Sequence, residues 1–275
     1  MLLTRRHALG GLLGAGAALT LAACTSDDPS RTTNVDPNKL DGVLARVKDS
    51  GTIRIGMEGV YAPYGYHEGG KLVGIEKEIG DLVAQDLGVK ATYIESKWDS
   101  LIAGIDVNKY DVIFNNIVPT EERKQKYDFS IPYARSIGKV AVLKGSGITA
   151  IDQVKGKRAA QTPSSNWGKQ AAALGAEIVT VEGFVQAVEL VNSGRADLTL
   201  NDFVSFQQFF KKTPNAKIEL LKGDVEANIQ ICALFNKGNA DFKAELDKVL
   251  GKRLADGSIS AIMKKYTDTD FTPTK

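Results

Sequence analysis

From Asp41 onward, segments with the pattern of β-strands alternate with segments with the pattern of amphipathic helices. Residues 52–57 alternate between polar and apolar side chains as a strand does, and residues 76–86 place their apolar side chains on one helical face. A helix that returns the chain between strands is typical of parallel sheets. The alternation therefore predicts an α/β fold with largely parallel sheets.

The same patterns predict further elements. Strands are expected at 71–74, 90–95, 111–115, 157–160, 177–181 and 196–200. Helices are expected at 100–107, 167–174, 184–193, 203–211, 240–256 and 258–266, the last two separated by Gly257.

Two longer extended stretches, 138–143 and 228–236, bracket the second group of elements. They are suited to be crossovers between two lobes. This layout predicts a discontinuous first lobe, residues 41–135 plus 230–270, and an inserted second lobe, residues 138–228. Two crossing strands then form a hinge, and a ligand is expected in the cleft between the lobes.

The N-terminal segment has the pattern of an export signal. Arg5 and Arg6 precede an uncharged stretch, residues 8–23, that is too short to span a bilayer comfortably. Its end, Leu-Ala-Ala-Cys24, resembles the lipobox of bacterial lipoproteins, in which the cysteine is acylated and becomes the new N-terminus. We therefore expect a signal peptide at 1–23, lipid on Cys24 and a flexible polar tether at 24–40. A plain signal peptide is the alternative, and both the general and the twin-arginine export routes stay open.

Charge argues against nucleic acid as a partner. The chain has 35 basic and 33 acidic side chains, and without Arg5 and Arg6 the two numbers are equal. A neutral mature chain offers no electrostatic attraction to phosphates.

Cysteine and histidine are scarce. With Cys24 lipidated, Cys232 has no disulfide partner, and its apolar neighbours predict a buried thiol. The two histidines, His7 and His67, lie in the signal and in a loop, so neither a metal site nor a cofactor is expected.

Several motifs, in this order and spacing, resemble the polar amino acid-binding proteins of ABC importers, solute-binding family 3. They lie at 52–64, 70–74, 98–99, 109–113, 120–124, 127–133, 190–202 and 255–258. The resemblance covers nearly all of the chain after the tether. It implies a type II periplasmic-binding-protein-like fold with two lobes and a two-strand hinge.

The resemblance assigns Arg123 to the ligand's α-carboxylate. A guanidinium is a rigid fork of donors that matches a carboxylate, and Thr120 begins the helix expected around it. From the residues alone, a solvated arginine on a charged helix is an equal alternative. In the family, Asp202 accepts the α-ammonium, and the alternative for Asp202 is a helix N-cap.

The remaining site residues also follow from the resemblance. Tyr61 and Trp98 match aromatic positions that enclose the ligand's aliphatic stem, with two core aromatics as the alternative. Glu58 matches an acidic position that contacts the ligand side chain, and Ser165 matches a hydroxyl-bearing loop that reaches the α-carboxylate.

The chain departs from the family pattern beside the expected side-chain pocket. Asn116 stands where many members have a glycine that lets the backbone approach the ligand, and Val118 stands where they have Ser or Thr. Asn116 and Thr120 are therefore also expected among the ligand-binding residues. The Asn115–Asn116 pair is most similar to the L-cystine-type branch.

The resemblance implies an exported, monomeric binding protein that is not an enzyme. It would be anchored through Cys24 to the outer face of the cell membrane, or be periplasmic, and deliver a polar L-amino acid, with L-cystine the first candidate, to the subunits of an ABC permease. The alternatives are a periplasmic dehydratase-like enzyme on the same scaffold and a ligand-sensing receptor component.

Overall fold

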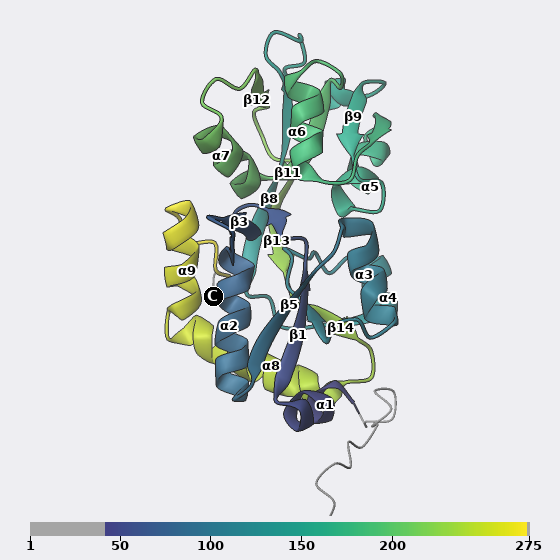
Figure 1. Cartoon of the computed structure of the whole chain (residues 1–275). Helices are drawn as coiled ribbons and strands as arrows, with labels where there is room; N and C mark the ends of the chain where they lie inside the picture. Colours follow the sequence, from purple (N-terminus) through teal and green to yellow (C-terminus); the bar gives the residue numbers. More distant parts are fainter. Residues whose placement is uncertain (1–41, 274–275) are drawn as a thin grey trace, which may run out of the picture. The chain divides into compact units, whose positions relative to one another are not determined.

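The computed structural model describes residues 42–273, which fold into two lobes, each built on its own sheet (Figure 1). The strands of the first sheet, in spatial order, are β5 (Lys90–Glu95), β1 (Thr52–Met57), β6 (Val112–Ile113), β14 (Leu234–Asn236) and β7 (Tyr127–Phe129). Those of the second are β10 (Glu177–Thr180), β9 (Arg158–Gln161), β11 (Leu198–Asp202), β8 (Ala134–Leu143) and β12 (Ile218–Leu220), with β13 (Glu226–Ile231) also on β8. The α/β architecture in two lobes is thus confirmed.

Both sheets are mixed. β1 lies parallel to β5 and β6, and β9 lies parallel to β10 and β11. β8 and β14, in contrast, run antiparallel to their neighbours. The prediction of largely parallel sheets is wrong, because the strands that carry the chain between the lobes pair directly and have no helical crossover.

The two strands that join the lobes lie side by side, and the first of them begins at Ala134, four residues before the predicted stretch 138–143. β8 and β13 pair antiparallel, with Ala134 opposite Ile231 and Ser136 opposite Ile229. The second stretch is interrupted at Cys232 and Ala233, after which β14 joins the first sheet. A separate small sheet, β2 (Val60–Tyr61), β3 (Gly65–Glu68) and β4 (Lys71–Val73), belongs to the first lobe.

Helices pack against both sheets (Figure 1). Those of the first lobe are α1 (Val43–Ser50), α2 (Ile75–Leu87), α3 (Trp98–Asp106), α4 (Glu121–Lys126), α8 (Ala240–Ala255) and α9 (Ser258–Thr267). The second lobe has a short 3₁₀ turn, η1 (Ile151–Val154), and the helices α5 (Asn166–Ala173), α6 (Phe184–Asn192) and α7 (Phe203–Lys212).

Helix α2 illustrates why these segments are helical. Ile75, Ile79, Val83 and Leu87 recur every four residues and are all buried, so one face of α2 contributes to the core. The helix ends at Gly88, whose φ of 71° is the left-handed conformation that closes a helix without steric cost for glycine.

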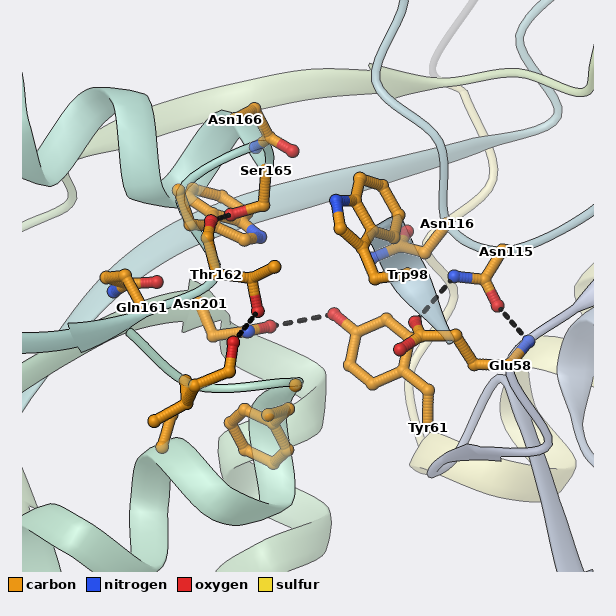
Figure 2. Close-up of a pocket in the computed structure, with 15 residues that line it drawn as sticks. Glu58, Tyr61, Trp98, Asn115, Asn116, Gln161, Thr162, Ser165, Asn166 and Asn201 are labelled. Carbon is orange, nitrogen blue, oxygen red and sulfur yellow. Dashed lines mark hydrogen bonds between the residues drawn. The ribbon is translucent and has the colours of Figure 1, made fainter. Parts of the chain in front are cut away.

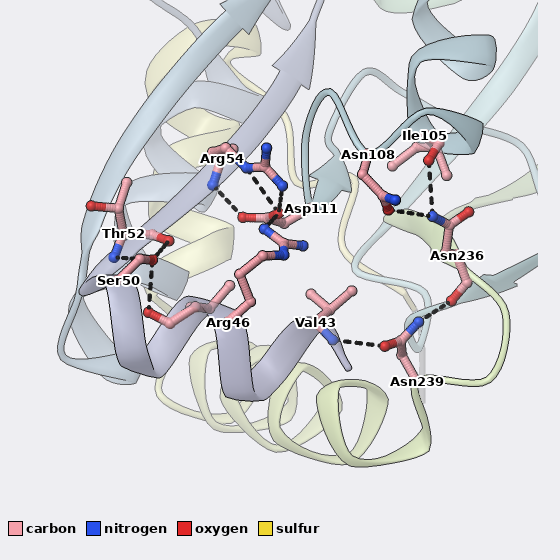
Figure 3. Close-up of polar contacts among 11 residues, drawn as sticks. Val43, Arg46, Ser50, Thr52, Arg54, Ile105, Asn108, Asp111, Asn236 and Asn239 are labelled. Carbon is pink, nitrogen blue, oxygen red and sulfur yellow. Dashed lines mark hydrogen bonds and ion pairs between the residues drawn. The ribbon is translucent and has the colours of Figure 1, made fainter. Parts of the chain in front are cut away.

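Helix α1 is fastened to the base of the first lobe (Figure 3). Arg46 and Arg54 both contact the carboxylate of Asp111, which is fully buried. The backbone N–H of Val43 donates to Oδ1 of Asn239 over 2.8 Å. The first helix is therefore held by buried charge and not by its short apolar face alone.

Cys232 is a buried free thiol, as predicted, and burial raises its pKa to about 12. Within residues 42–273, none of the helices has the length and apolar character needed to cross a membrane.

Candidate functional site

A cavity of about 50 Å³ lies where strand ends of the two sheets face one another (Figure 2). Glu58 follows β1, Asn116 follows β6, Thr162 follows β9 and Asn201 lies at the end of β11. The carboxyl ends of parallel strands are where open α/β sheets bind ligands. The walls of the cavity are formed by Glu58, Tyr61, Trp98, Asn115, Asn116, Gln161, Thr162, Ser165, Asn166, Trp167, Val181, Gly183, Phe184, Ala187 and Asn201.

Five of the eight residues assigned to the ligand line this cavity: Glu58, Tyr61, Trp98, Asn116 and Ser165. The other three, Thr120, Arg123 and Asp202, are not part of its wall. The predicted lipidation site, Cys24, lies outside the described residues, as do the signal peptide and the tether.

Arg123 is buried, with 8% of its surface exposed, and is stacked on the cavity wall. Its guanidinium lies 5.2 Å from the centre of the Trp98 ring, and its Nη1 donates to the backbone oxygen of Val118 over 2.9 Å. Among residues 42–273 it has no ion-pair partner, because the carboxylate of Glu122 pairs with Lys169 instead. Burial lowers the pKa of Arg123 to about 10, with the Glu122 charge opposing. The buried guanidinium of Arg123 therefore lacks the anionic partner that would offset the cost of burying its charge.

Thr120 begins α4. Its Oγ1 accepts the backbone N–H of Arg123 over 3.3 Å, so the threonine fixes the turn from which Arg123 projects.

Asp202 fills the N-cap position that sequence reasoning left as its alternative. Oδ1 accepts the N–H groups of Val204, over 2.8 Å, and Ser205, over 3.3 Å, at the start of α7. The same oxygen accepts the hydroxyl of Tyr64 over 2.5 Å, and Oδ2 accepts the hydroxyl of Ser136. Burial raises the pKa of Asp202, and the bonds from Ser136 and Tyr64 oppose that shift. The carboxylate therefore links α7, the crossover strand β8 and the first lobe.

Tyr61 crosses the cleft. Its hydroxyl donates to Oδ1 of Asn201 over 2.7 Å, and its ring centre lies 6.1 Å from that of Phe184 in α6 (Figure 2). A tyrosine that only filled the core of one lobe would not bond to a strand end of the other. Its position fits a wall of the cleft better than the core alternative does.

Glu58 and Asn115 form a reciprocal pair (Figure 2). The N–H of Glu58 donates to Oδ1 of Asn115 over 2.9 Å, and Nδ2 of Asn115 donates to Oε2 of Glu58 over 2.8 Å. Burial raises the pKa of Glu58 to about 7, the Asn115 bond opposes this, and the charge of Asp99 adds to it. Oε1 has no hydrogen-bond partner within the described chain, so it is available to a ligand.

Ser165 caps α5 from within the cavity wall. Its Oγ accepts the N–H of Gly168 over 2.9 Å and donates to the backbone oxygen of Thr162 over 2.7 Å. The hydroxyl is therefore engaged in local structure, and Ser165 contributes to the site mainly by shaping the loop before α5.

Five polar residues of the cavity wall are not among the eight assigned residues: Asn115, Gln161, Thr162, Asn166 and Asn201. Asn166 is the first residue of α5, and the other four lie within two residues of the end of a strand with parallel neighbours. The rule that ligands bind at the carboxyl ends of such strands was the signal that points to them.

Polar contacts join the two lobes around the cavity. Lys97 pairs with Glu182 over 2.7 Å, and Lys211 pairs with Asp268 over 2.6 Å. Asp99–Ser164 and Glu122–Lys169 add two further contacts across the cleft. Residues 42–273 hold no cluster of His, Cys, Asp and Glu arranged as a metal site.

Residues 53–269 match the model of the bacterial extracellular solute-binding proteins, family 3. The L-cystine-binding protein TcyA of Bacillus subtilis (strain 168) is 34% identical over 273 residues, which are 97% of this chain and 99% of the relative.

Two solved structures extend the comparison. The L-cystine solute receptor of Neisseria gonorrhoeae, unliganded and open, is 33% identical and has a TM-score of 0.58, covering 84% of this chain and 99% of the other. An ancestral arginine-binding protein bound to arginine is 29% identical and has a TM-score of 0.73, covering 78% and 98%. This chain therefore superposes better on the ligand-bound protein, although its sequence is more similar to the unliganded one.

Proposed function

The chain belongs to the bacterial extracellular solute-binding proteins, family 3, and from that premise we propose that it binds an L-amino acid between its lobes and delivers it to the permease of an ABC importer. Two of its relatives, TcyA and the Neisseria gonorrhoeae receptor, bind L-cystine, which is therefore the first ligand to test. Because its family is one of solute-binding proteins and TcyA is a binding protein, we infer that this chain is a binding protein and not an enzyme.

One observation carries the proposal. Arg123 is a buried guanidinium beside Trp98 with no carboxylate partner within the described chain. A buried charge is costly unless it is paired, and a ligand carboxylate is the partner that matches its geometry. We assign Arg123, with Thr120 positioning it, to the α-carboxylate, together with the Ser165 loop.

The other assignments follow from the cavity. Tyr61 and Trp98 enclose the aliphatic stem, and Asp202, whose carboxylate also caps α7, is assigned to the α-ammonium. Glu58 and Asn116 face the side chain, and the open Oε1 of Glu58 suits a distal ammonium such as the second amino group of cystine.

Binding requires the lobes to part. The cavity of about 50 Å³ has room for a few water molecules and not for an amino acid of the size of cystine. The lobes would open about β8 and β13, admit the ligand and close again, and the closed form would be what the permease recognises. The lobe boundaries proposed for this motion are 41–135 plus 230–270 and 138–228. They are supported by the strands of the two sheets, of which only β8 and β13 run across a boundary.

The N-terminal pattern predicts where the protein acts. The family is one of extracellular solute-binding proteins, and we propose that export is followed by lipidation of Cys24, which tethers a monomeric binding protein to the outer face of the membrane.

Calorimetric titration of residues 37–275, refolded free of ligand, against the common amino acids and L-cystine tests the function. Saturable binding of one or a few L-amino acids is expected. If none of them binds, amino acid transport is refuted, and the Arg123 assignment with it.

A further inference from the structure

Glu76 is a buried carboxylate beside the cavity that has no part in the site described above. It lies in the first turn of α2 and is 1% exposed. Oε1 accepts the backbone N–H of Asn116 over 3.0 Å, and Oε2 accepts the hydroxyl of Tyr133 over 2.6 Å. Both oxygens are thus occupied by other elements of the first lobe and not by solvent.

The residue held by Oε1 has an unusual backbone. Asn116 has a φ of 52°, in the left-handed region that residues other than glycine rarely adopt. Such a conformation persists where the surrounding structure holds it, often at a ligand site. Asn116 is also a wall residue of the cavity, so its backbone conformation decides where its side-chain amide points.

Asn116 shares the cavity wall with Tyr61, the residue whose hydroxyl crosses the cleft. Tyr61 in turn donates to Asn201 of the second lobe. A change in the backbone of Asn116 therefore alters the cavity wall that it shares with Tyr61 and Asn201.

The residue held by Oε2 supplies a firm anchor. Tyr133 is fully buried, and its N–H donates to the backbone oxygen of Ile231 over 3.0 Å, where the two crossover strands meet. Glu76 thus ties the cavity wall to the base of the hinge.

We propose that Glu76 is a positioning residue for ligand selectivity, which keeps Asn116 left-handed so that its amide faces the ligand's side chain. This inference rests on the proposed function. Glycine adopts the left-handed region without steric cost, so a protein with glycine at position 116 has no need of the hydrogen bond from Asn116 to Glu76, which we call the brace. Glu76 therefore matters here because position 116 carries a side chain.

A double-mutant cycle tests this directly. Glu76→Met removes the acceptor and keeps most of the volume, and Asn116→Gly removes the need for it. With L-cystine as the probe, Glu76→Met should weaken binding by about tenfold, the size of one lost hydrogen bond, and reduce the preference for L-cystine over L-arginine. In the Asn116→Gly background the same change should cost less than about threefold. Glu76→Gln, which keeps an acceptor for the Asn116 N–H, should restore most of the binding.

The chain offers a matched control. Glu78 lies in the same turn of α2 but bonds to Tyr266 and Lys265, so Glu78→Met should leave L-cystine binding unchanged. Should Glu76→Met not fold, Glu76→Asp carries the same expectation, because the shorter side chain withdraws the carboxylate from Asn116. Equal losses with Asn and with Gly at position 116 would overturn the inference.

A second readout does not need ligand. Hydrogen exchange of the backbone N–H of Asn116 should become at least about tenfold faster in Glu76→Met than in Glu78→Met. Only Glu76→Met removes the acceptor of that N–H. Unchanged exchange overturns the brace even if amino acids bind. Absence of binding by the wild-type protein would instead refute the proposed function, and the selectivity role with it, while the exchange rates still decide the brace.

Discussion

Replacing Arg123 by methionine should separate binding from stability. In the absence of ligand, the folded protein keeps this guanidinium away from water, at a cost in the free energy of folding. Its pKa of about 10 places the cost of the buried charge at about 3 kcal/mol. Below about pH 10 the guanidinium is charged in both the folded and the unfolded protein, so the full cost of the lowered pKa is present at pH 7.

Methionine removes that cost together with two favourable contacts. The hydrogen bond to Val118 contributes about 1 kcal/mol, and the stacking on Trp98 contributes about 1 kcal/mol. The difference favours the variant by about 1 kcal/mol. The melting temperature of the ligand-free protein should therefore stay the same or rise by about 2–4 °C.

Binding should respond in the opposite direction. Removing one partner of a buried ion pair costs about 3–5 kcal/mol, so the Kd should rise by about a hundred-fold to a few thousand-fold. Calorimetry gives the Kd, and thermal melts with and without ligand give the stability. Arg123→Lys keeps the charge without the fork, and it should lie between wild type and Arg123→Met.

The reverse result would refute a ligand-binding role for Arg123. A variant that loses more than about 5 °C in melting temperature but binds as tightly as wild type would make Arg123 a structural residue.

Three further predictions concern other parts of the chain. The pKa of Glu58, raised to about 7, means that its carboxylate ionises between pH 6 and 8, so affinity for L-cystine should rise over that range and Glu58→Gln should flatten the calorimetric profile. A raised carboxyl pKa also means that this group's contribution to stability is full at acid pH and is lost as the pH rises through about 7. Glu122→Gln removes a contact across the cleft in which both side chains are more than half exposed; it should therefore favour opening only modestly, by at most about fivefold, which small-angle scattering of the ligand-free protein at low salt can measure. In cells, Cys24→Ser should move the protein from the membrane fraction to the soluble fraction, and a protein that stays with the membrane would exclude lipid on Cys24 as its anchor.

Much of the fold was predictable from local patterns. The predicted strands at 52–57 and 90–95 coincide with β1 and β5, and the predicted helix at 76–86 lies within α2. Helix α1 was missed because it buries only Val43 and Val47 and begins at Gly42 without a side-chain cap. The predicted strand at 111–115 shortens to Val112–Ile113, since the side chain of Asn115 turns to bond Glu58. Antiparallel pairing of the crossover strands is a tertiary outcome that periodicity does not encode.

The site was predictable in residue type more than in arrangement. The resemblance named five residues of the cavity wall, and the cap of α7 was the alternative stated for Asp202. Neither indicated that Asp202 also bonds to Tyr64 and Ser136 or that Arg123 lies against Trp98. Those details depend on side-chain directions set by packing between the lobes. The contacts of Glu76 could not be predicted either, because its partners Asn116 and Tyr133 lie 40 and 57 positions further along the chain. The left-handed backbone at Asn116 is also not indicated by any single residue type.

The docking of α1 has a practical consequence for attaching the molecule to a surface. Asp111 and Asn239, which hold Arg46 and Val43, both belong to the first lobe, so a pull on the N-terminus is borne by that lobe before it reaches β8 or β13. The second lobe is then free to move relative to the attached first lobe. A sensor immobilised through its N-terminus should accordingly keep the ligand affinity of the protein in solution, since the attachment point and the joint are mechanically separate.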